Sequence, residues 1–443
     1  MRPPNPKEIP NYIPSFLPFS IQLGLTTAYE GKKYIDSGEK CPVCGSIHLK
    51  KTGFVDKLFA KFITPKGFVE MSVKLQRYQC NDCGEWWQAL GPFYPDTQYG
   101  APIVDLILAL SSNNSSYTVE GILASMGLQV SSDSILRYIR MFAKRARERA
   151  PLVKGSGLYG INMLKLLFGV NNAGELARML GKELESCSDE TYLRRKGALK
   201  KLMEEVKVNP ELARQQNKIV DKEGNVPDSF TLALSYLPGA EAYSSLLVTG
   251  MPFNELLAEI LARTLEGSSF NITDASKSYN SMKDHVLDPV HRARNELKHD
   301  KQFRDMVSKA KDLKKQEANA VTLSERNEIH DKRLKLIDEL SKYAKDRYHV
   351  ILEETLKPLR EQFPEYFDSD GNFIGHITSN SMEGGNWRIK YAIRLPFIRT
   401  DTVAGKSILA AVKDSVFTMR KGKNRVSIAE RLGSFSFAGV MGA

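Results

Sequence analysis

Two pairs of cysteines constrain the fold of this chain more than any other feature. CPVCG carries Cys41 and Cys44, and CNDCG carries Cys80 and Cys83. Each CxxCG turn can present two thiolates to one tetrahedral Zn²⁺, and its glycine permits the tight backbone turn. The residues between the two pairs alternate between apolar and polar, as in β-strands, so a β-hairpin would account for the long spacing. The sequence therefore predicts a zinc ribbon over residues 39–95 with one closed, structural zinc site.

Composition favours a DNA-binding protein of a reducing compartment. The formal net charge is +11, and counterion release favours the binding of a basic protein to nucleic acid. Four of the five cysteines stand in CxxC pairs, which suits metal binding better than a disulfide framework. Residues 1–38 form a proline-rich arm without a continuous apolar stretch, so we expect neither a signal peptide nor a membrane span. These features predict a cytoplasmic protein with no membrane partner.

Residues 100–150 predict a helix-turn-helix. Three segments there have helical periodicity, and the third, SSDSILRYIRMFAKRARER, carries an apolar and a basic face. The basic residues are expected to contact DNA, although a solvated face of an ordinary helical bundle would have the same pattern. They are Arg137, Arg140, Lys144 and Arg147. Residues 156–212 have a similar pattern and predict a second helix-turn-helix-like helical region, with Ser188 capping its last helix.

The periodicity changes to that of strands near residue 215. NKIVD, SFTLALSYL and AYSSLLVTG predict three antiparallel strands, followed by a helix in PFNELLAEILARTLEG and a fourth strand in SSFNITD. This order is typical of a ribonuclease H-like sheet. We therefore expect a multidomain α+β protein whose ribonuclease H-like α/β catalytic domain spans 215–284 and 363–430. An all-α insertion at 285–362 would interrupt it, and NFIGHITSN would form the fifth strand.

Three acids are the candidate catalytic residues of that domain. Asp221 would end the first strand and Asp274 the fourth, and a helix after the fifth strand would supply Glu383. Carboxylates gathered in one cleft raise one another's pKa, which two divalent cations would offset. Oxygen ligands suit Mg²⁺ or Mn²⁺, and such a pair of ions activates the attack on a phosphodiester. Basic side chains beyond Glu383 would hold DNA phosphates, namely those of Arg388, Lys390 and Arg394.

Other interpretations of these acids remain open. Asp274 alone would serve as a helix N-cap, and Glu383 as a first-turn acid favoured by the helix dipole. DKEGN, which contains Asp221, also reads as a hairpin turn. Asp189 and Asp228 are therefore alternatives for the first acid.

Several motifs resemble those of DDE transposases from insertion sequences. FNITDASKSY resembles the strand with the second aspartate, and TSNSMEGGNWRIKYAIR resembles the glutamate helix. The spacing of 109 residues (383 minus 274) is similar to that of the Mutator-type group, whose catalytic sheet carries an all-α insertion at this place. DPVHRARNE, with Asp288 in place of the family's cysteine, resembles the helix that opens the insertion. SDETYLRRKG, which contains Asp189, resembles the family's motif around the first catalytic aspartate.

The resemblance implies a transposase that binds the terminal inverted repeats of a mobile element and performs metal-dependent strand cleavage and strand transfer. Two Mg²⁺ or Mn²⁺ ions and one Zn²⁺ would be its cofactors. Its partners would be double-stranded DNA, as element ends and target, and a second copy in a homodimer or larger assembly at the prokaryotic nucleoid. A domesticated, catalytically inactive DNA-binding regulator and a nuclease that acts on repair or recombination junctions are the alternatives.

Overall fold

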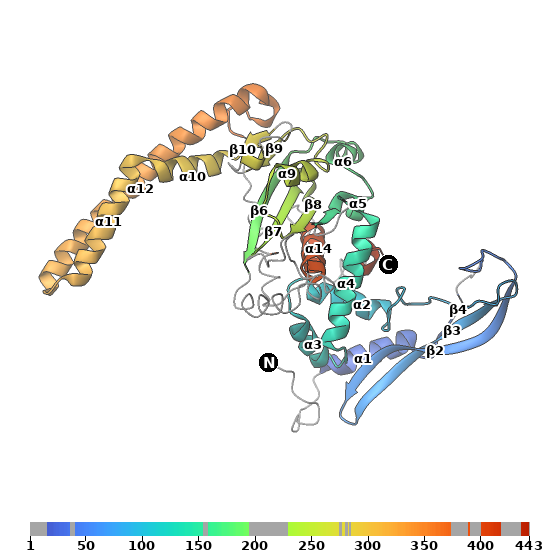
Figure 1. The fold of residues 1–443 in the computed structure, drawn as a ribbon. Helices are drawn as coiled ribbons and strands as arrows, with labels where there is room; N and C mark the ends of the chain where they lie inside the picture. Colours follow the sequence, from blue (N-terminus) through green and yellow to red (C-terminus); the bar gives the residue numbers. More distant parts are fainter. Residues whose placement is uncertain are drawn as a thin grey trace, which may run out of the picture.

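A computed structural model of the chain describes residues 16–35, 40–153, 158–194, 229–273, 277–279, 282, 285–373, 389, 400–417 and 436–442. These residues form a mixed α/β structure. It contains a small N-terminal sheet, a group of helices, a larger sheet and a helical arm that projects from one edge of the larger sheet (Figure 1).

The N-terminal sheet is built on one long hairpin, as the cysteine spacing predicted. Strands β2 and β3 pair antiparallel along their length, β1 adds parallel to β3, and β4 pairs with the end of β3. Their bounds are Lys33–Tyr34 for β1, Leu49–Thr64 for β2, Gly67–Cys80 for β3 and Trp86–Gln88 for β4.

The segment expected to form a proline-rich arm contains a helix. Helix α1 spans Phe16–Tyr29. Its Ile21 and Leu25 pack against the buried core, and the ring of Tyr29 stacks on that of Phe59 at 4.4 Å. Tertiary packing therefore stabilises a helix that local propensity did not predict.

Three helices follow, as predicted for residues 100–150: α2 (Ala101–Ser111), α3 (Ser116–Ser125) and α4 (Ser132–Arg149). Gly127 follows α3 with a φ of 78°, a conformation that favours glycine. Its carbonyl accepts a hydrogen bond of 2.8 Å from the N–H of Ile63 in β2. The turn between α3 and α4 is thereby joined to the hairpin.

The larger sheet has six strands in the order β10-β9-β6-β7-β8-β5. Strands β6, β7 and β8 are antiparallel, β9 runs parallel to β6, and β10 runs parallel to β9. The strands are β5 (Leu158–Asn162), β6 (Ser186–Arg194), β7 (Ser229–Leu237), β8 (Ala242–Thr249), β9 (Asn271–Thr273) and β10 (His285–Leu287). The strands predicted in SFTLALSYL, AYSSLLVTG and SSFNITD are confirmed as β7, β8 and β9.

Helices cover both faces of this sheet. Leu232 and Leu234 belong to the buried cluster that contains residues of α4 and α14, whereas Ala233 and Leu237 belong to the cluster that contains residues of α5, α6 and α9. This alternation along β7 is that of a strand buried on both sides. The helix bounds are Met163–Phe168 for α5, Ala173–Leu180 for α6, Glu255–Ala262 for α9 and Thr400–Phe417 for α14.

Three segments predicted to be helical are strands. Leu158–Asn162, expected at the start of the helical region 156–212, is β5 and pairs with β8. Ser186–Arg194, expected largely within the last helix of that region, is β6, and Ser188 is a paired strand residue and caps no helix. His285–Leu287, expected to open the all-α insertion, is β10 and pairs with β9. In each case hydrogen bonding to another strand outweighs local propensity. The fifth strand therefore precedes the inserted helices. Of the segment predicted as that strand, only Asn372 and Phe373 are among the described residues.

The inserted helices form an arm. They are α10 (Pro289–His299), α11 (Lys301–Asn319) and α12 (Leu323–Gln362), so helix is confirmed from residue 289 onward. Helices α11 and α12 lie side by side and project beyond the sheet (Figure 1). Near the tip, Arg333 Nε donates to a Glu317 carboxylate oxygen at 2.6 Å, and near the base the Tyr343 hydroxyl donates to Asp300 at 2.9 Å. A polar contact thus fixes the register of the two helices at each end.

The C-terminal helix α16 (Phe437–Val440) returns to α2. The Asp105 carboxylate of α2 accepts hydrogen bonds from the Tyr94 hydroxyl at 2.6 Å and from the N–H of Ala438 at 2.9 Å. Burial raises the pKa of Asp105. Phe437 is buried in the same core as α2, so this short helix is anchored by both polar and apolar contacts.

Lys406 gives α14 a pH-dependent stability. Its side chain is fully buried, and its Nζ donates to the carbonyl oxygen of Asn114 at 2.7 Å. Burial lowers the pKa of Lys406 from 10.5 to about 8. Between these pH values the unfolded chain binds the proton more fully than the folded chain, so the free energy of unfolding should rise with pH in that window.

We expect Lys406→Met to remove this rise. The measurement is the free energy of unfolding in urea at pH 7.5 to 10.5. The difference between wild type and variant at each pH isolates the contribution of Lys406 from those of other groups that titrate in this range. Lys413→Met is the comparison variant: burial lowers the pKa of Lys413 as well, but this side chain of the same helix is only half-buried, so its loss should remove less of the pH slope. Equal pH slopes for wild type and Lys406→Met would contradict the expectation.

Candidate metal centre and acid-bearing sheet edge

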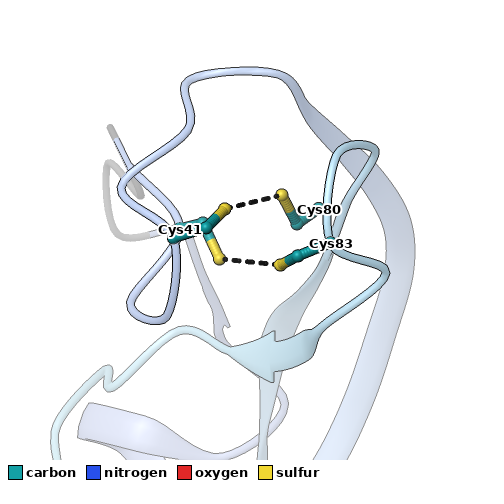
Figure 2. Close-up of side chains that lie close together, drawn as sticks. Cys41, Cys80 and Cys83 are labelled. Carbon is teal, nitrogen blue, oxygen red and sulfur yellow. Dashed lines mark hydrogen bonds between the residues drawn. The ribbon is translucent and has the colours of Figure 1, made fainter.

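The four cysteines of the CxxC pairs converge at one end of the hairpin. Their Sγ atoms all lie within 4.8 Å of one another, and the Sγ–Sγ distances are 3.6 Å for Cys41 to Cys83 and 3.6 Å for Cys44 to Cys80 (Figure 2). A tetrahedral zinc with Zn–S bonds of about 2.3 Å separates its sulfurs by about 3.8 Å. The four-cysteine group could therefore hold a metal ion such as zinc.

Each cysteine pair is presented by its own backbone turn, and the two turns have the same conformation. The N–H of Gly45 donates to the carbonyl of Cys41 at 3.0 Å, and the N–H of Gly84 donates to the carbonyl of Cys80 at 3.0 Å. The two glycines have φ values of 72° and 77°. Such angles are strained for other residues, which explains the glycine after each CxxC.

Hydrogen bonds around the cluster favour the thiolate of Cys80 and join the two turns, whereas contacts with the neighbouring cysteine side chains raise the pKa of Cys83. The backbone N–H groups of Cys83 and Asp82 lower the pKa of Cys80 to about 7. The Asp82 carboxylate accepts a hydrogen bond from the Ser46 hydroxyl, and its Oδ1 lies 3.3 Å from His48 Nδ1. These contacts lower the pKa of Asp82. The side chain of His48 is 69% exposed.

A second candidate site lies where β9 ends beside the parallel strand β6. Their register pairs Ser186 with Asn271 and Ser188 with Thr273. The next residue on β6 is Asp189, whose side chain is partly exposed. The residue after Thr273 in the chain is Asp274, which lies outside the described residues. The pairing thus brings together the two residues that precede these acids.

Asp288 contributes another acid near this edge. It follows β10, its side chain is 1% exposed, and its N–H donates to the carbonyl of Thr273 at 2.7 Å. Burial, followed by the charges of nearby acids, raises the pKa of Cys187 well above its usual value. Asp189 lies on the same face of the sheet as this thiol, because it stands two residues further along β6, and Asp288 is near enough to act on the thiol electrostatically.

The other predicted catalytic and DNA-binding residues of this region lie outside the described residues. They are Asp221, Asp228, Asp274, Glu383, Arg388, Lys390 and Arg394. Ile389, which is described, is fully buried in the cluster that also contains Cys187. The place between β7 and β9, where the strand with Asp221 was expected, is occupied by β6 with Asp189. The motif SDETYLRRKG signals Asp189, but the helical periodicity of the residues around it hides the strand.

The four basic residues of α4 differ in their surroundings. Arg137 and Lys144 are exposed, and Lys144 Nζ lies 3.8 Å from a Glu148 carboxylate oxygen. Arg140 Nε donates to the hydroxyl of Thr402 in α14 at 2.9 Å. The guanidinium of Arg147 lies 4.9 Å from the ring centre of Tyr159. Arg140 and Arg147 therefore contact other elements of the protein, whereas Arg137 contacts Tyr138 and Lys144 contacts Glu148 within α4 itself.

Comparison of the chain with protein-family models and with curated proteins found no match. Among the described helices, none combines the length and the apolar character that crossing a membrane requires.

Proposed function

We propose that this chain is a DNA transposase of the DDE class that cuts and joins DNA ends with two divalent cations held by Asp189, Asp274 and Glu383. The observation that carries the proposal is the parallel pairing of β6 with β9, which sets Ser188 beside Thr273. The acids at 189 and 274 follow these two residues directly. The order of three antiparallel strands, a crossover helix and a strand parallel to the first supports the ribonuclease H-like arrangement expected from the sequence.

The spacing of the strands suits shared metal ions. Neighbouring strands lie about 4.8 Å apart, and consecutive Cα atoms are about 3.8 Å apart. Carboxylates at positions 189 and 274 would therefore be close enough to bridge cations that lie about 3.5 to 4 Å apart. Oxygen ligands favour Mg²⁺ or Mn²⁺. When bound, these ions would activate the attacking oxygen and stabilise the leaving oxygen of the phosphodiester.

The strand order supports Asp189 as the first acid in place of Asp221. In the proposed arrangement the first acid stands on the strand between the second strand and the fourth. Strand β6 has this position, between β7 and β9. Two acids of the site would then be held by the sheet, and Glu383 would come from the segment that precedes the buried Ile389. The protein would orient the DNA first for attack by water and then for attack by the freed 3′-hydroxyl on target DNA.

DNA binding is supported by the net charge of +11 and by the exposed basic side chains of α4. We predict that Arg137→Ala and Lys144→Ala each weaken duplex binding several-fold and lower the slope of log affinity against log salt by about 1. Fluorescence anisotropy at 50 to 200 mM salt measures both effects. Arg140→Ala is the control: it should lower thermal stability through loss of its bond to Thr402 and leave the salt slope unchanged.

Strand cleavage tests the proposal as a whole. The substrate is a labelled duplex that contains the DNA flanking the coding sequence, incubated with the full chain in Mg²⁺. We expect 3′-hydroxyl ends, followed by joining to a target plasmid, and we expect Glu383→Gln to abolish both. Specific binding without cleavage in Mg²⁺ or Mn²⁺ would favour the DNA-binding regulator. Cleavage that Glu383→Gln leaves unchanged would remove Glu383 from the site.

A further inference from the structure

The helical arm carries its positive and negative charges on different helices. Helix α12 has 40 residues, about 60 Å at 1.5 Å per residue, and α10 and α11 pack along it in turn (Figure 1). Glu317 at the end of α11 pairs with Arg333 of α12 at 2.6 Å. Asp300 at its start pairs with Arg347 of α12 at 3.6 Å. Both contacts turn an acid of the α11 side and a base of the α12 side toward each other.

These contacts leave an excess of positive charge on α10 and α11. Apart from the four residues that form them, residues 289–319 hold nine lysines and arginines against three acids. Helix α12 holds seven lysines and arginines against nine acids. The arm therefore has one basic helical layer and one layer of mixed, slightly acidic charge.

Four of the basic residues of α11 stand on one side of the helix. Positions 301, 304, 308, 311 and 315 follow one another at spacings of three and four, which places them along one line of a helix. All except Ser308 are basic, and these four basic side chains are exposed. Within the part of the chain that the structure describes, none of them forms an ion pair. They are the α11 stripe: Lys301, Arg304, Lys311 and Lys315.

The α11 stripe destabilises its own helix when nothing covers it. Like charges three or four positions apart on a helix repel each other, and Lys311 and Lys315 are such a pair. The positions three and four away from Lys311 hold Val307, Ser308, Lys314 and Lys315, so no neighbouring acid offsets its charge. A counter-charge from outside the helix would remove this repulsion.

Helix α12 shows how a merely solvated surface of the same arm is arranged. There Lys332 Nζ lies 2.6 Å from a Glu328 carboxylate oxygen. Lys342 stands four positions from both Asp338 and Asp346. Charges of alternating sign are typical of a solvent-exposed helix. Solubility is therefore met on α12 by mixed charge, and it does not account for the unmixed α11 stripe.

The chemistry of the α11 stripe suits a phosphate backbone better than a protein. Lys301 and Lys315 are 14 positions apart (315 minus 301), about 21 Å along the helix, and duplex DNA carries about twelve phosphate charges over that length. The five positions of the line hold no apolar side chain. The centre of a protein–protein interface, by contrast, is poor in lysine and rich in aromatic residues.

The position of the arm favours the same partner. Helix α10 begins at Pro289, directly after Asp288 of the acid-bearing sheet edge. The arm thus leaves the larger sheet beside that edge and projects away from it (Figure 1). DNA that reaches the edge can continue along the arm.

We propose that the α11 stripe is a second DNA-binding surface, which holds the phosphate backbone of duplex DNA that extends from the acid-bearing edge along the arm. The inference rests on the proposed function only for the choice of DNA as the polyanion. Phosphate contacts carry no sequence information, so the α11 stripe binds duplexes of any sequence.

The experiment compares two double variants of the full chain. Lys311→Gln with Lys315→Gln removes two charges of the α11 stripe, and Lys335→Gln with Lys342→Gln removes two exposed charges of α12. Fluorescence anisotropy measures the affinity for a labelled duplex of unrelated sequence at 50 to 200 mM salt, without Mg²⁺ or Mn²⁺. We expect the α11 variant to lower the slope of log affinity against log salt by about 2, and the affinity at 50 mM salt at least about tenfold. The α12 variant should stay within about twofold of the wild type, because acids four positions away already offset both lysines.

Thermal unfolding without DNA shows whether the arm of the α11 variant is folded. This variant should be as stable as the wild type or more stable, because the substitutions remove like-charge repulsion. A lower stability would assign the lost affinity to unfolding of the arm and would overturn the inference.

The other outcomes separate the α11 stripe from its rivals and from the proposed function. An unchanged salt slope in the α11 variant would overturn the inference, and so would an equal fall in both variants, which would report net charge alone. A change in self-association by sedimentation velocity, with DNA affinity unchanged, would assign the α11 stripe to a second copy of the chain instead. A wild-type chain that binds DNA through the α11 stripe and never cleaves it would refute the proposed function and leave this surface in place.

Discussion

Asp189→Asn is expected to lower the rate of DNA strand cleavage about a thousandfold, while Asp221→Asn keeps a rate close to that of the wild type. An amide binds divalent cations far more weakly than a carboxylate, and a thousandfold loss corresponds to about 4 kcal/mol of transition-state stabilisation. The difference between the two variants follows from the strand order, in which β6 occupies the place beside β9. Single-turnover cleavage in Mg²⁺ measures it.

The substitution of a carboxylate by an amide of the same shape should leave DNA affinity and thermal stability nearly unchanged. Both are measured on the same preparations. The opposite result, in which Asp221→Asn loses cleavage and Asp189→Asn keeps it, would return the first acid to the segment NKIVD. Cleavage at the wild-type rate in both variants would show that neither Asp189 nor Asp221 is a ligand of the catalytic ions.

Cys80→Ser is expected to remove the zinc of the N-terminal hairpin and to unfold it. The wild-type chain should contain one zinc per molecule, because four Sγ atoms lie within 4.8 Å of one another. Structural zinc contributes on the order of 10 kcal/mol to the folding of small zinc domains. We therefore expect the free energy lost when one ligand is removed to exceed the free energy that packing contributes to the hairpin. Metal content by mass spectrometry and proteolysis of residues 40–90 measure the two effects.

Cys187→Ala is the matched control for this prediction. Cys187 is the fifth cysteine, is fully buried and lies in the larger sheet. The alanine variant should keep one zinc per chain and a protease-resistant hairpin, although its overall stability will fall through the cavity it leaves. Full zinc content in Cys80→Ser would show that the four thiols are not the ligands.

The cysteine cluster was predictable from sequence because its determinants are local. Each turn needs two cysteines and a glycine within five residues, and the alternating text between the turns predicted the hairpin. Strands β7 and β8 and helix α9 were predicted for the same reason, since their apolar residues follow a clear period. Helix α1 was not predicted, because contacts such as that between Tyr29 and Phe59 join residues far apart in the chain.

Strand β6 was missed because two of its buried positions, Ser186 and Ser188, are hydroxyl residues. Across the sheet, Thr273, Ser188, Ser235 and Ser245 occupy neighbouring positions on four strands, and all four are fully buried. The hydroxyls of Ser188 and Ser235 bond to each other at 2.7 Å. Ser188 and Ser235 satisfy each other only after their strands have paired, so a single strand gives no sign of burial.

The candidate catalytic site was predictable only in part for the same reason. The text around Asp189 suggested an acid of functional interest, but its strand and its neighbour β9 are joined by pairing over a long sequence separation. The bond between Glu190 and Tyr279 connects residues 89 positions apart. Neither contact leaves a periodic pattern in the sequence that would reveal it.

The pairing of Ser188 with Thr273 also has a consequence during protein synthesis. It closes a loop of 85 residues (273 minus 188), which takes a ribosome roughly 5 to 15 seconds to extend. In the proposed function, a nascent chain that has emerged only as far as β8 would hold one carboxylate and bind the cations poorly. Chromosomal DNA near the site of translation would thereby be protected from cutting by unfinished chains.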